Sequence, residues 1–590
     1  MLRSEELDQE SFDEILTSAV DKMNEYYPVW TDHNPSDPGM ALLELMAWYT
    51  EVARYHLNVI DRENIYRYLK LLGYRPQGIR PSKTILKVTG SGRLPRLSRF
   101  FADKLPFETT MDLDVQDNEI SYAGSGKERI DNRNHILEEL DGTLQIYPFG
   151  KEETNRYFEI GFEKELPQKE VIGLYFHVRP VDGMARVEDA FEGILTAKAE
   201  YYDGDWKREV EILRDDTKGF LRSGILNFMI KGNVRACRSF RIRFFVEGGD
   251  FACLPVITGM VLNAVPAVQT YTNTSAEQVL STACGICNLR VKLEDQNILG
   301  DGLEICVSGQ DGRFRWTRVE DFDLSDKEDR HYIYDEDTAE LVFGDGIRGC
   351  PPEGDILLTG YTTSYGMAGN VKKHMVNGET DQFRAVNVLP SEGGHDRETI
   401  EECYERLFED RRKLYRCITL QDFEQAVRSV PGFVVHRVHA FRGKENTVCI
   451  CVETEGVTKK LNEGCLAKVR EFLMPRVLLG TKVEFLEPQY VGIHVYLDVS
   501  VNPSYQDVKQ QTQEALNKYF DGADAGFGCL IRKNELGRYV HGLPWIRGLK
   551  SMEFSAAGSG VTVMNNGDLR LADDCLPVVE HVVVNIVKFK

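Results

Sequence analysis

The feature that most constrains this chain is the short apolar pattern of its middle part, from Pro81 to about residue 390. Segments such as TILKVTG, GLYFHVRP and FRIRFFVEG alternate or run apolar over a few positions, and Gly, Asp and Asn separate them. A period of two is typical of strands with one buried face, and turn residues at this spacing are typical of sandwiches. The pattern predicts β-rich domains, two over residues 77–275 and one more over 276–390.

The first part of the chain, residues 1–76, has the pattern of helices instead. Ser36 or Asp37 can cap a helix that has Pro38 in its first turn. Apolar or bulky residues then recur every three or four positions over about five turns, as one face of a helix requires. The residues of this stripe are Leu42, Leu45, Tyr49, Val52, His56 and Val59.

Further apolar residues, among them Met46 and Trp48, widen this surface beyond one stripe. A helix that is apolar on more than one side must be covered on more than one side. The stripe therefore belongs either to the core of its own domain or to an interface with helices of a partner, and the sequence leaves both open. His56 is expected to be a packed or hydrogen-bonded histidine rather than a ligand. A second helix is predicted near Ile65 to Leu72, ending at Gly73.

Helices and strands mix after Ser391. Thr419 and Asp422 form a capping pattern at the start of one helix. A later helix is expected from the spacing of Val508, Thr512, Leu516 and Phe520. Two small α+β domains, over residues 391–487 and 488–590, account for this part. The predicted fold class is multidomain α+β, with an N-terminal helical segment, β-sandwich-like middle domains and small C-terminal α+β domains.

Composition narrows the classes of function. The 590 residues carry a net charge of −22, which argues against sequence-independent binding to nucleic acid. This net charge does not exclude a local basic patch. No apolar run reaches the ~18 residues of a membrane span. The acidic start MLRSEELDQESFDEIL lacks the pattern of a signal peptide, so synthesis and folding in the cytoplasm are expected.

The thirteen cysteines, Cys237 to Cys575, are odd in number and follow no tight framework, as expected for reduced thiols. Only Cys284 and Cys287 form a C-x-x-C pair, and no second pair completes a zinc site. We expect these cysteines to be small buried thiols. Cys449 and Cys451 alternate with Val and Ile, which predicts a strand.

The segment LVFGDGIRGCPPEGD fits the spacing G-x-G-x-x-G through Gly344, Gly346 and Gly349. A dinucleotide loop must open a helix, whose N-terminus binds the phosphates. Here Pro351 and Pro352 follow, and the next segment, DILLTGY, is another strand. The glycines are therefore interpreted as tight turns between strands, and no nucleotide cofactor is expected.

No other catalytic or metal-binding motif is present in the sequence. DQNILGDGLEIC starts like a calcium loop, but Leu299 and Cys306 stand where oxygen ligands belong. No pair of carboxylates is singled out for glycoside hydrolysis. The sequence predicts no enzyme, no catalytic residue, no metal and no cofactor.

The glycine loop, together with the following YTTSYGMAGNV, resembles the baseplate J-like family of contractile phage tails and related injection systems. Members of that family carry an F-G-D-G…G…P-P-x-G turn and then a G-x-x-G-N-V segment. The matching residues are Phe343, Gly344, Asp345, Gly346, Gly349, Pro351, Pro352, Gly354, Gly366, Gly369, Asn370 and Val371.

Other segments resemble the same family, and they follow its order along nearly the whole chain. WTDHNPSDPGMALLELMAWYTE resembles the opening helix of its baseplate assembly proteins. YYDGDWKREVEILRDDTKGFLRSGIL resembles a segment of its β domains. EGGHDRETIEE, CITLQDFEQAV and RVLLGTKVEFLEPQYVGIHV resemble later elements, with Cys417-Ile418 where an Ala or Ser followed by Val is usual.

The resemblance implies a structural role. Such proteins build the wedges of a six-fold baseplate around a central spike, and their N-terminal helices join helices of neighbouring wedge proteins. The baseplate holds sheath and tube in a loaded state until a signal opens it. The partners implied are other wedge proteins, a second copy or paralogue of this chain, and spike, hub and sheath-proximal proteins. Nucleic acid and membrane insertion are not implied. The chain would be part of a tail-like particle assembled in the cytoplasm.

Two other interpretations compete with this one. The strand-rich middle is also compatible with a receptor- or glycan-binding protein of the adhesin type. A polysaccharide-active enzyme is the third, although no residue is singled out for its chemistry.

Overall fold

A computed structural model describes most of the chain. It covers residues 11–31, 33–58, 62–126, 128–149, 157–187, 196–202, 204–207, 210–231, 240–247, 254–274, 277–295, 297–310, 312–336, 338–380, 382–412, 415–455, 459, 461–522 and 525–587. Strands hold 41% of the residues and helices 22%, so the chain is mostly β. It separates into two compact units. The first comprises residues 1–83, 269–371 and 391–413, and the second 84–268, 372–390 and 414–590.

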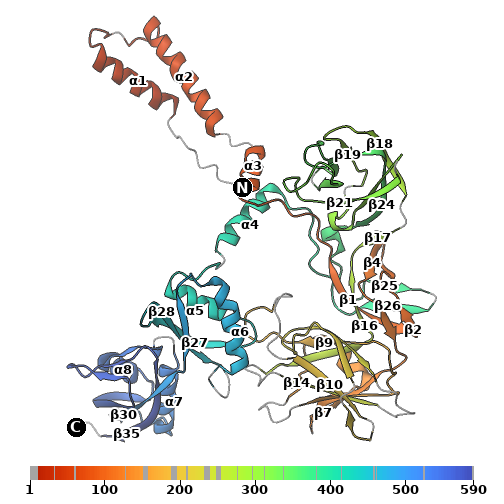
Figure 1. The fold of residues 1–590 in the computed structure, drawn as a ribbon. Coiled ribbons are helices and arrows are strands. Elements are labelled where there is room, and N and C mark those ends of the chain that lie inside the picture. The colour runs from red at the N-terminus through yellow and green to blue at the C-terminus, as the bar shows by residue number, and fades with distance from the viewer. Residues whose placement is uncertain are drawn as a thin grey trace. The chain divides into compact units, whose positions relative to one another are not determined.

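The first unit holds the N-terminal helices, which Figure 1 draws in red and orange. The helices α1 (Phe12–Tyr26) and α2 (Pro38–Asn58) pack on each other as an antiparallel hairpin. The helix α3 (Arg62–Leu71) packs on α4 (Ile400–Arg412), with Leu69 and Cys403 buried between them. Gly73 ends α3 with a positive φ of 79°, as the sequence predicted.

The first unit also contains an eight-stranded sheet. Its long strand β24 (Glu353–Thr363) pairs with three others, and only one neighbouring pair, β21 with β22, is parallel. The short helix η2 (Gly300–Gly302) precedes β20 and contacts β24, and η3 (Gly366–Gly369) follows β24. The other strands are β17 (Tyr271–Asn273), β18 (Gln278–Cys284), β19 (Arg290–Lys292), β20 (Glu304–Gly309), β21 (Gly312–Arg318), β22 (His331–Asp335) and β23 (Glu340–Phe343).

The second unit begins with a six-stranded sheet whose strands come from distant parts of the chain. Its order is β25-β26-β1-β16-β4-β3. Leu86 of β1 pairs with Asn387 of β26, so residues on both sides of the predicted boundary at 275 share one sheet. The strands are β1 (Lys83–Gly90), β3 (Arg99–Ala102), β4 (Leu105–Thr109), β16 (Ala264–Val268), β25 (Asn377–Glu379) and β26 (Phe383–Asn387); β2 (Gly92–Leu94) and β5 (Leu113–Val115) form a separate ribbon.

Two further sheets of the second unit enclose one core and form a sandwich. Phenylalanines fill this core, and Phe176 has the rings of Phe158, Phe220 and Phe244 at 6.4, 5.2 and 5.9 Å. One sheet comprises β6 (Ile120–Ser125), β7 (Glu128–Asp131), β8 (Phe158–Phe162), β10 (Thr196–Tyr202), β11 (Trp206–Lys207) and β14 (Arg241–Glu247). The other comprises β9 (Ile172–Val178), β12 (Val210–Asp215), β13 (Gly224–Ile230) and β15 (Ile257–Leu262), and η1 (Arg133–Glu138) lies beside β15.

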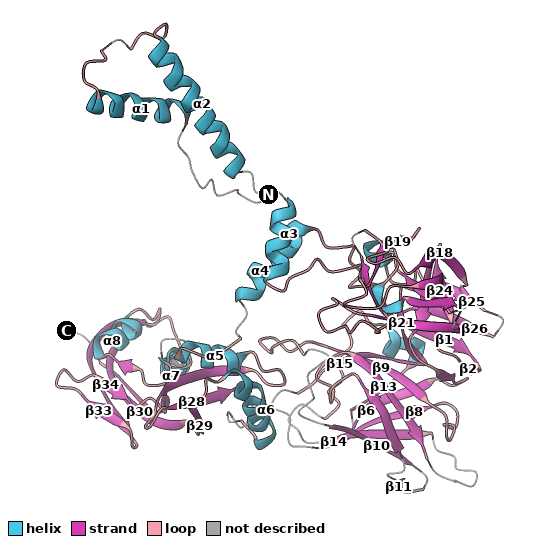
Figure 2. Cartoon of the chain, turned by 45° about the horizontal axis from the view of Figure 1, so that its top comes forward, coloured by secondary structure: helices cyan, strands magenta, loops and turns pink. Residues whose placement is uncertain are grey.

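Two small α+β layers complete the second unit, with helices on sheets as Figure 2 shows. In the first, Thr419 caps α5 and Asp422 closes the capping box, as predicted. Its elements are α5 (Leu420–Arg428), β27 (Val435–Arg442), β28 (Thr447–Thr454), α6 (Glu463–Leu473), η4 (Met474–Arg476) and β29 (Lys482–Leu486). Cys449 and Cys451 are buried in the central strand β28.

The second layer is built on β30, whose alternate residues from Val491 to Val499 are buried. The helix α7 (Val508–Phe520) contains the four residues of the predicted stripe, all buried. The remaining elements are β30 (Gln489–Val501), β31 (Leu530–Ile531), α8 (Lys533–His541), β32 (Ile546–Ala557), β33 (Val561–Val563), β34 (Leu569–Leu571) and β35 (Cys575–Ile586).

The two layers share a buried junction. Cys451 of the first layer packs with Phe527 and Leu576 of the second. The guanidinium of Arg437 donates to the carbonyl of Phe520 at 2.7 Å and lies 3.6 Å from the carboxylate of Glu453. Both side chains of this ion pair are nearly inaccessible.

Candidate functional site

The helical hairpin carries the residues that the sequence singled out as an interface. Its first helix starts with a capping box, because Ser11 donates to Glu14 Oε2 from its backbone N–H at 2.8 Å and from its hydroxyl at 3.0 Å. The Phe12 N–H donates to Glu51 Oε1 of α2 at 3.2 Å. These bonds fix where α1 begins and tie it to α2.

The second helix begins directly after Asp37. Of the two candidates Ser36 and Asp37, it is Asp37 that caps the helix. Asp37 Oδ2 accepts hydrogen bonds from the N–H groups of Gly39 and Met40 at 2.8 and 3.2 Å. A Cβ on Gly39 would lie 3.1 Å from the ring of Trp30, so the absence of a side chain there lets the indole approach the helix. Asp37, Pro38 and Gly39 therefore set the turn that brings α2 back along α1.

The two faces of α2 have different surroundings. Ala47 and Met40 are buried, and Leu43 is half-buried on the same face. The opposite surface is apolar and open, with five large side chains that keep between 54% and 70% of their surface exposed. We call this surface the α2 face, and it comprises Leu42, Leu45, Met46, Trp48 and Tyr49.

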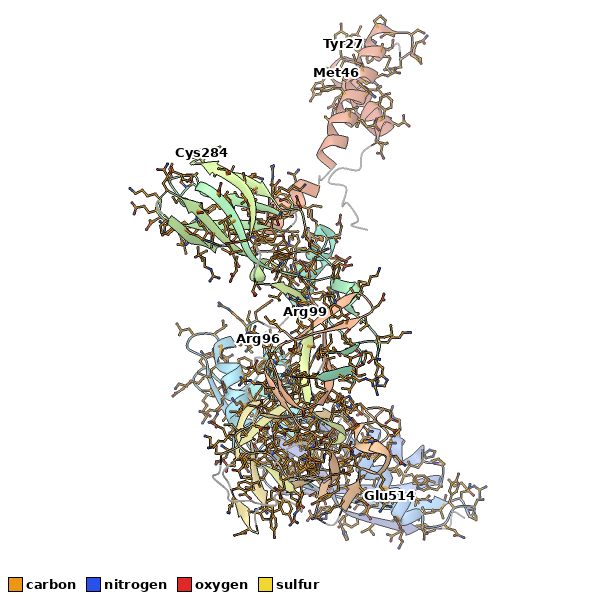
Figure 3. The ribbon with its side chains drawn as sticks, turned by 90° about the vertical axis from the view of Figure 1, so that its right-hand side faces the viewer. Tyr27, Met46, Arg96, Arg99, Cys284 and Glu514 are labelled. Carbon is orange, nitrogen blue, oxygen red and sulfur yellow. The ribbon has the colours of Figure 1, made fainter. Side chains whose placement is uncertain are left out.

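Three of the predicted stripe residues, Leu42, Leu45 and Tyr49, lie in the α2 face, and Val52 is half-buried. The side chain of His56 and the residue Val59 lie outside the described part of the structure. Met46 is labelled on the hairpin in Figure 3, as is Tyr27, an exposed aromatic residue that the sequence stripe did not include. Tyr26, Tyr27 and Val29 are also exposed. They lie too close together in sequence to show the three-four spacing of a helix face.

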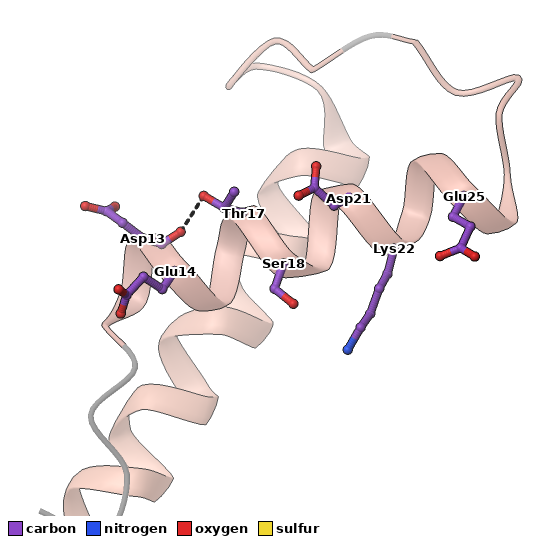
Figure 4. Close-up of a pocket in the computed structure, with 7 residues that line it drawn as sticks. All are labelled: Asp13, Glu14, Thr17, Ser18, Asp21, Lys22 and Glu25. Carbon is purple, nitrogen blue, oxygen red and sulfur yellow. Dashed lines mark hydrogen bonds between the residues drawn. The ribbon is translucent and has the colours of Figure 1, made fainter.

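The outer face of α1 is polar, in contrast to the α2 face. Figure 4 shows it, with the Thr17 hydroxyl donating to the carbonyl of Asp13 at 2.6 Å. Four of its seven residues are acidic and one is basic, which is ordinary for a solvated helix surface. The residues are Asp13, Glu14, Thr17, Ser18, Asp21, Lys22 and Glu25.

The glycine loop has the geometry of a turn between the strands β23 and β24. A Cβ on Gly344 would lie 2.2 Å from the carbonyl oxygen of Gly349, and Gly346 and Gly349 have φ of 82° and 85°. Asp345 Oδ1 accepts from the N–H groups of Ile347 and Arg348 at 2.8 and 2.7 Å. These backbone bonds, that of Arg348 first, lower the pKa of Asp345.

After this loop the chain enters β24 directly and forms no helix. Pro351 and Pro352 lie in the connection, and Glu353 already begins the strand. A dinucleotide-binding loop would open a helix at this point. The role of the glycines as turn residues stays a prediction.

Gly369 and Asn370 of the second motif form hydrogen bonds to distant segments of the chain. The Gly369 carbonyl accepts from the hydroxyls of Ser82 and Ser391 at 2.6 and 2.5 Å. The amide of Asn370 exchanges two bonds with Gly394, at 2.8 and 2.9 Å. These residues connect three segments of the first unit and act structurally.

The expectation of buried cysteines is wrong for the C-x-x-C pair. Cys284 and Cys287 are both exposed, because they lie at the end of β18 and in the turn that follows it. Within the described ranges, no group of three or more His, Cys, Asp and Glu side chains is placed to hold a metal ion. No helix among the described residues is long and apolar enough to cross a membrane.

Comparison with known proteins finds similar chains among solved structures. No family model and no curated protein matches the chain. Among solved structures, it is similar to a chain of the anti-feeding prophage (AFP) baseplate, at 12% identity and a TM-score of 0.34, over 96% of this chain and 90% of that one. It is also similar to a chain of the type VI secretion system TssK-TssF-TssG baseplate subcomplex, at 12% identity and a TM-score of 0.38, over 76% and 96%. At such scores two chains need not share a fold, so the function must be argued from this chain's own residues.

Proposed function

We propose that this protein is a structural subunit of the baseplate of a contractile injection system or phage-like tail. The observation that carries the proposal is the α2 face, a continuous apolar surface on a hairpin that has little core of its own. Burying one such side chain contributes about 1.5–3 kcal/mol, so covering the face with a neighbouring subunit is strongly favourable. Exposed apolar surfaces of this kind mark interaction sites, and we assign this one to a neighbouring subunit.

The sequence motifs indicate the kind of assembly to which the protein belongs. The F-G-D-G turn, the G-x-x-G-N-V segment and the opening helix stand in the order found in baseplate J-like proteins. The role that follows is that of a wedge component, which joins other wedge proteins around the spike and couples the state of the baseplate to sheath contraction. No step of this role needs catalysis.

One substitution tests the α2 face within the whole assembly. Leu45→Asp places a charge in the centre of the face, whereas Ser18→Asp places the same charge on the polar outer face of α1. Both positions are exposed or half-exposed in the chain, so both variants are expected to fold. The measurement is affinity recovery of the tagged full-length chain from cells that make the particles, read by mass spectrometry.

Wild type and Ser18→Asp should be recovered with sheath, tube and spike proteins, and Leu45→Asp should lose these partners by at least about tenfold. Recovery of the wild-type chain alone, from cells with assembled particles, would overturn the baseplate role. Full co-recovery of Leu45→Asp would remove the α2 face as the interface.

A further inference from the structure

A second exposed apolar surface lies in the first of the two C-terminal layers, far in sequence from the hairpin. Two segments form it, residues 415–420 before α5 and residues 474–482 after α6. The Cys417 N–H donates to the carbonyl of Arg476 at 2.9 Å, and Cys417 and Val477 form a parallel bridge. Six large apolar residues of these segments keep between 40% and 106% of their surface exposed. We call them the leucine-turn patch: Tyr415, Ile418, Leu420, Met474, Leu478 and Leu479.

The backbone that carries the most exposed of these residues is fixed by hydrogen bonds. Leu479 occupies the second position of a turn in which the Thr481 N–H donates to the carbonyl of Leu478 at 3.1 Å, and Gly480 has a φ of 88°. Asn446 fixes the turn from the side, because its amide donates to the Gly480 carbonyl at 2.9 Å. A leucine presented on an ordered turn loses little conformational entropy on binding, which favours a contact there.

The other segment is ordered as well. Asp422 Oδ2 accepts from the N–H groups of Ile418 and Thr419 at 2.8 and 2.7 Å, which fixes the backbone that carries Ile418. In a hydrophobic staple a residue at this position would pack on Phe423. Phe423 is buried in the core, whereas Ile418 keeps 70% of its surface exposed. The side chain is therefore available to a partner.

The charges around the patch select the partner. The two segments contain three basic residues, Arg416, Arg476 and Lys482, and no acidic residue, although the chain as a whole has 93 acidic and 71 basic residues. The neighbouring carboxylates are Asp422, which accepts from the backbone of Ile418 and Thr419, and Glu484, which is exposed in β29. Arg476 lies over the ring of Phe472 at 3.8 Å and donates to its carbonyl, so Arg416 and Lys482 are the more available pair. Two copies of the patch facing each other would place these cations together, which is unfavourable.

We infer that the leucine-turn patch docks an acidic amphipathic segment of another protein, with an apolar stripe bordered by Asp and Glu. A helix presents such a stripe and its flanking charges on one surface. The contact combines burial of Leu479 and Ile418 with charge pairing to Arg416 and Lys482. This inference uses neither the α2 face nor the glycine loop.

The test uses the full-length chain and two synthetic helical peptides as probes. Both peptides carry the same leucine stripe, which is bordered by Glu in one and by Lys in the other. Fluorescence anisotropy should show saturable binding of the Glu peptide, at least about tenfold tighter than the Lys peptide. The affinity should fall as salt concentration rises, because exposed charges are screened.

Variants assign the binding to the patch. Leu479→Asp should weaken binding of the Glu peptide by at least about tenfold, and its full exposure makes misfolding no explanation. Arg416→Glu combined with Lys482→Glu should reverse the preference between the two peptides. Glu463→Gln, an exposed change at the far end of α6, is the matched control and should leave both affinities unchanged.

Three results would overturn the inference. One is binding of neither peptide, and another is equal binding of both. The third is self-association of the wild-type chain that Leu479→Asp abolishes in analytical ultracentrifugation, because a second copy would then occupy the patch. Failure here would leave the α2 face and its co-recovery experiment unaffected.

Discussion

In the sandwich of the second unit, Phe176 is enclosed by other phenylalanine rings and has no exposed surface. In α2, by contrast, Trp48 and Tyr49 keep more than half of their surface exposed. The sandwich closes two sheets over one core, whereas the hairpin consists of two helices, and among the described residues one face of α2 is left uncovered. The same kinds of side chain thus stabilise the fold in one region and stay exposed in the other.

This contrast teaches that the apolar content of a segment does not reveal what it stabilises. Two packed helices bury only the stripe between them, here around Ala47 and Leu43. A helix that served only its own hairpin would carry polar residues elsewhere, as the outer face of α1 does. The following predictions test how far the two regions differ.

The largest difference is expected between truncations of one aromatic ring in each region. Phe244→Ala removes a ring that contacts Phe176, Phe220 and Phe228, and it should destabilise the sandwich by about 3–5 kcal/mol. Trp48→Ala should change stability by less than about 0.5 kcal/mol. Hydrogen exchange of the full chain measures both, through β9 and β14 for the sandwich and through α1 and α2 for the hairpin. Equal destabilisation would contradict the contrast.

The two faces of α2 provide a comparison within one helix. Ala47→Asp buries a carboxylate between the helices and should destabilise the hairpin by more than about 2 kcal/mol. Leu45→Asp, two residues earlier, should leave hairpin stability nearly unchanged. Hydrogen exchange of the α1 amides reads the difference, since α1 loses its support only in the first variant. Faster exchange in both variants would mean that Leu45 contributes to the hairpin itself.

The smallest expected effect is a pH dependence confined to the hairpin. The backbone N–H of Ser11, and then its hydroxyl, lower the pKa of Glu14 below its ordinary value of 4.5. The lowered pKa means that this contribution is present above pH 4.5 and is lost as pH falls through the folded-state value. After correction for intrinsic rates, the amides of the first turn of α1 should therefore exchange faster at about pH 3 than at about pH 6.

Glu14→Gln provides the control for this titration. It should remove the pH dependence of the first turn and leave the amides of the sandwich unaffected. A pH dependence that persists in Glu14→Gln would show that another group near the start of α1 titrates.

Sequence reasoning succeeded where the determining interactions are local. The capping pair Thr419 and Asp422, the stop at Gly73 and the buried stripe of α7 each depend on neighbours within one or two turns. The interpretation of the glycine loop as a turn also uses local information, because two prolines disfavour a following helix.

Sequence reasoning was incomplete where strands pair with partners far away in the chain. Nothing in the period of β1 specifies that its partner lies some three hundred residues later, at Asn387. Burial of Cys284 was expected from the average behaviour of cysteine, but its position at the end of a strand decided otherwise. The leucine-turn patch was not predicted. A sequence pattern indicates which residues share a face, but it does not indicate whether another segment covers that face in the folded chain.

The junction between the two C-terminal layers has a mechanical consequence. Arg437, Glu453 and the cluster around Phe527 connect the layers through buried contacts rather than through a linker. Bending between the layers would have to separate a desolvated ion pair and expose an aromatic ring at the same time. Residues 415–587 of the described chain should therefore respond to an applied force as one stiff body and transmit displacement with little loss to internal hinging.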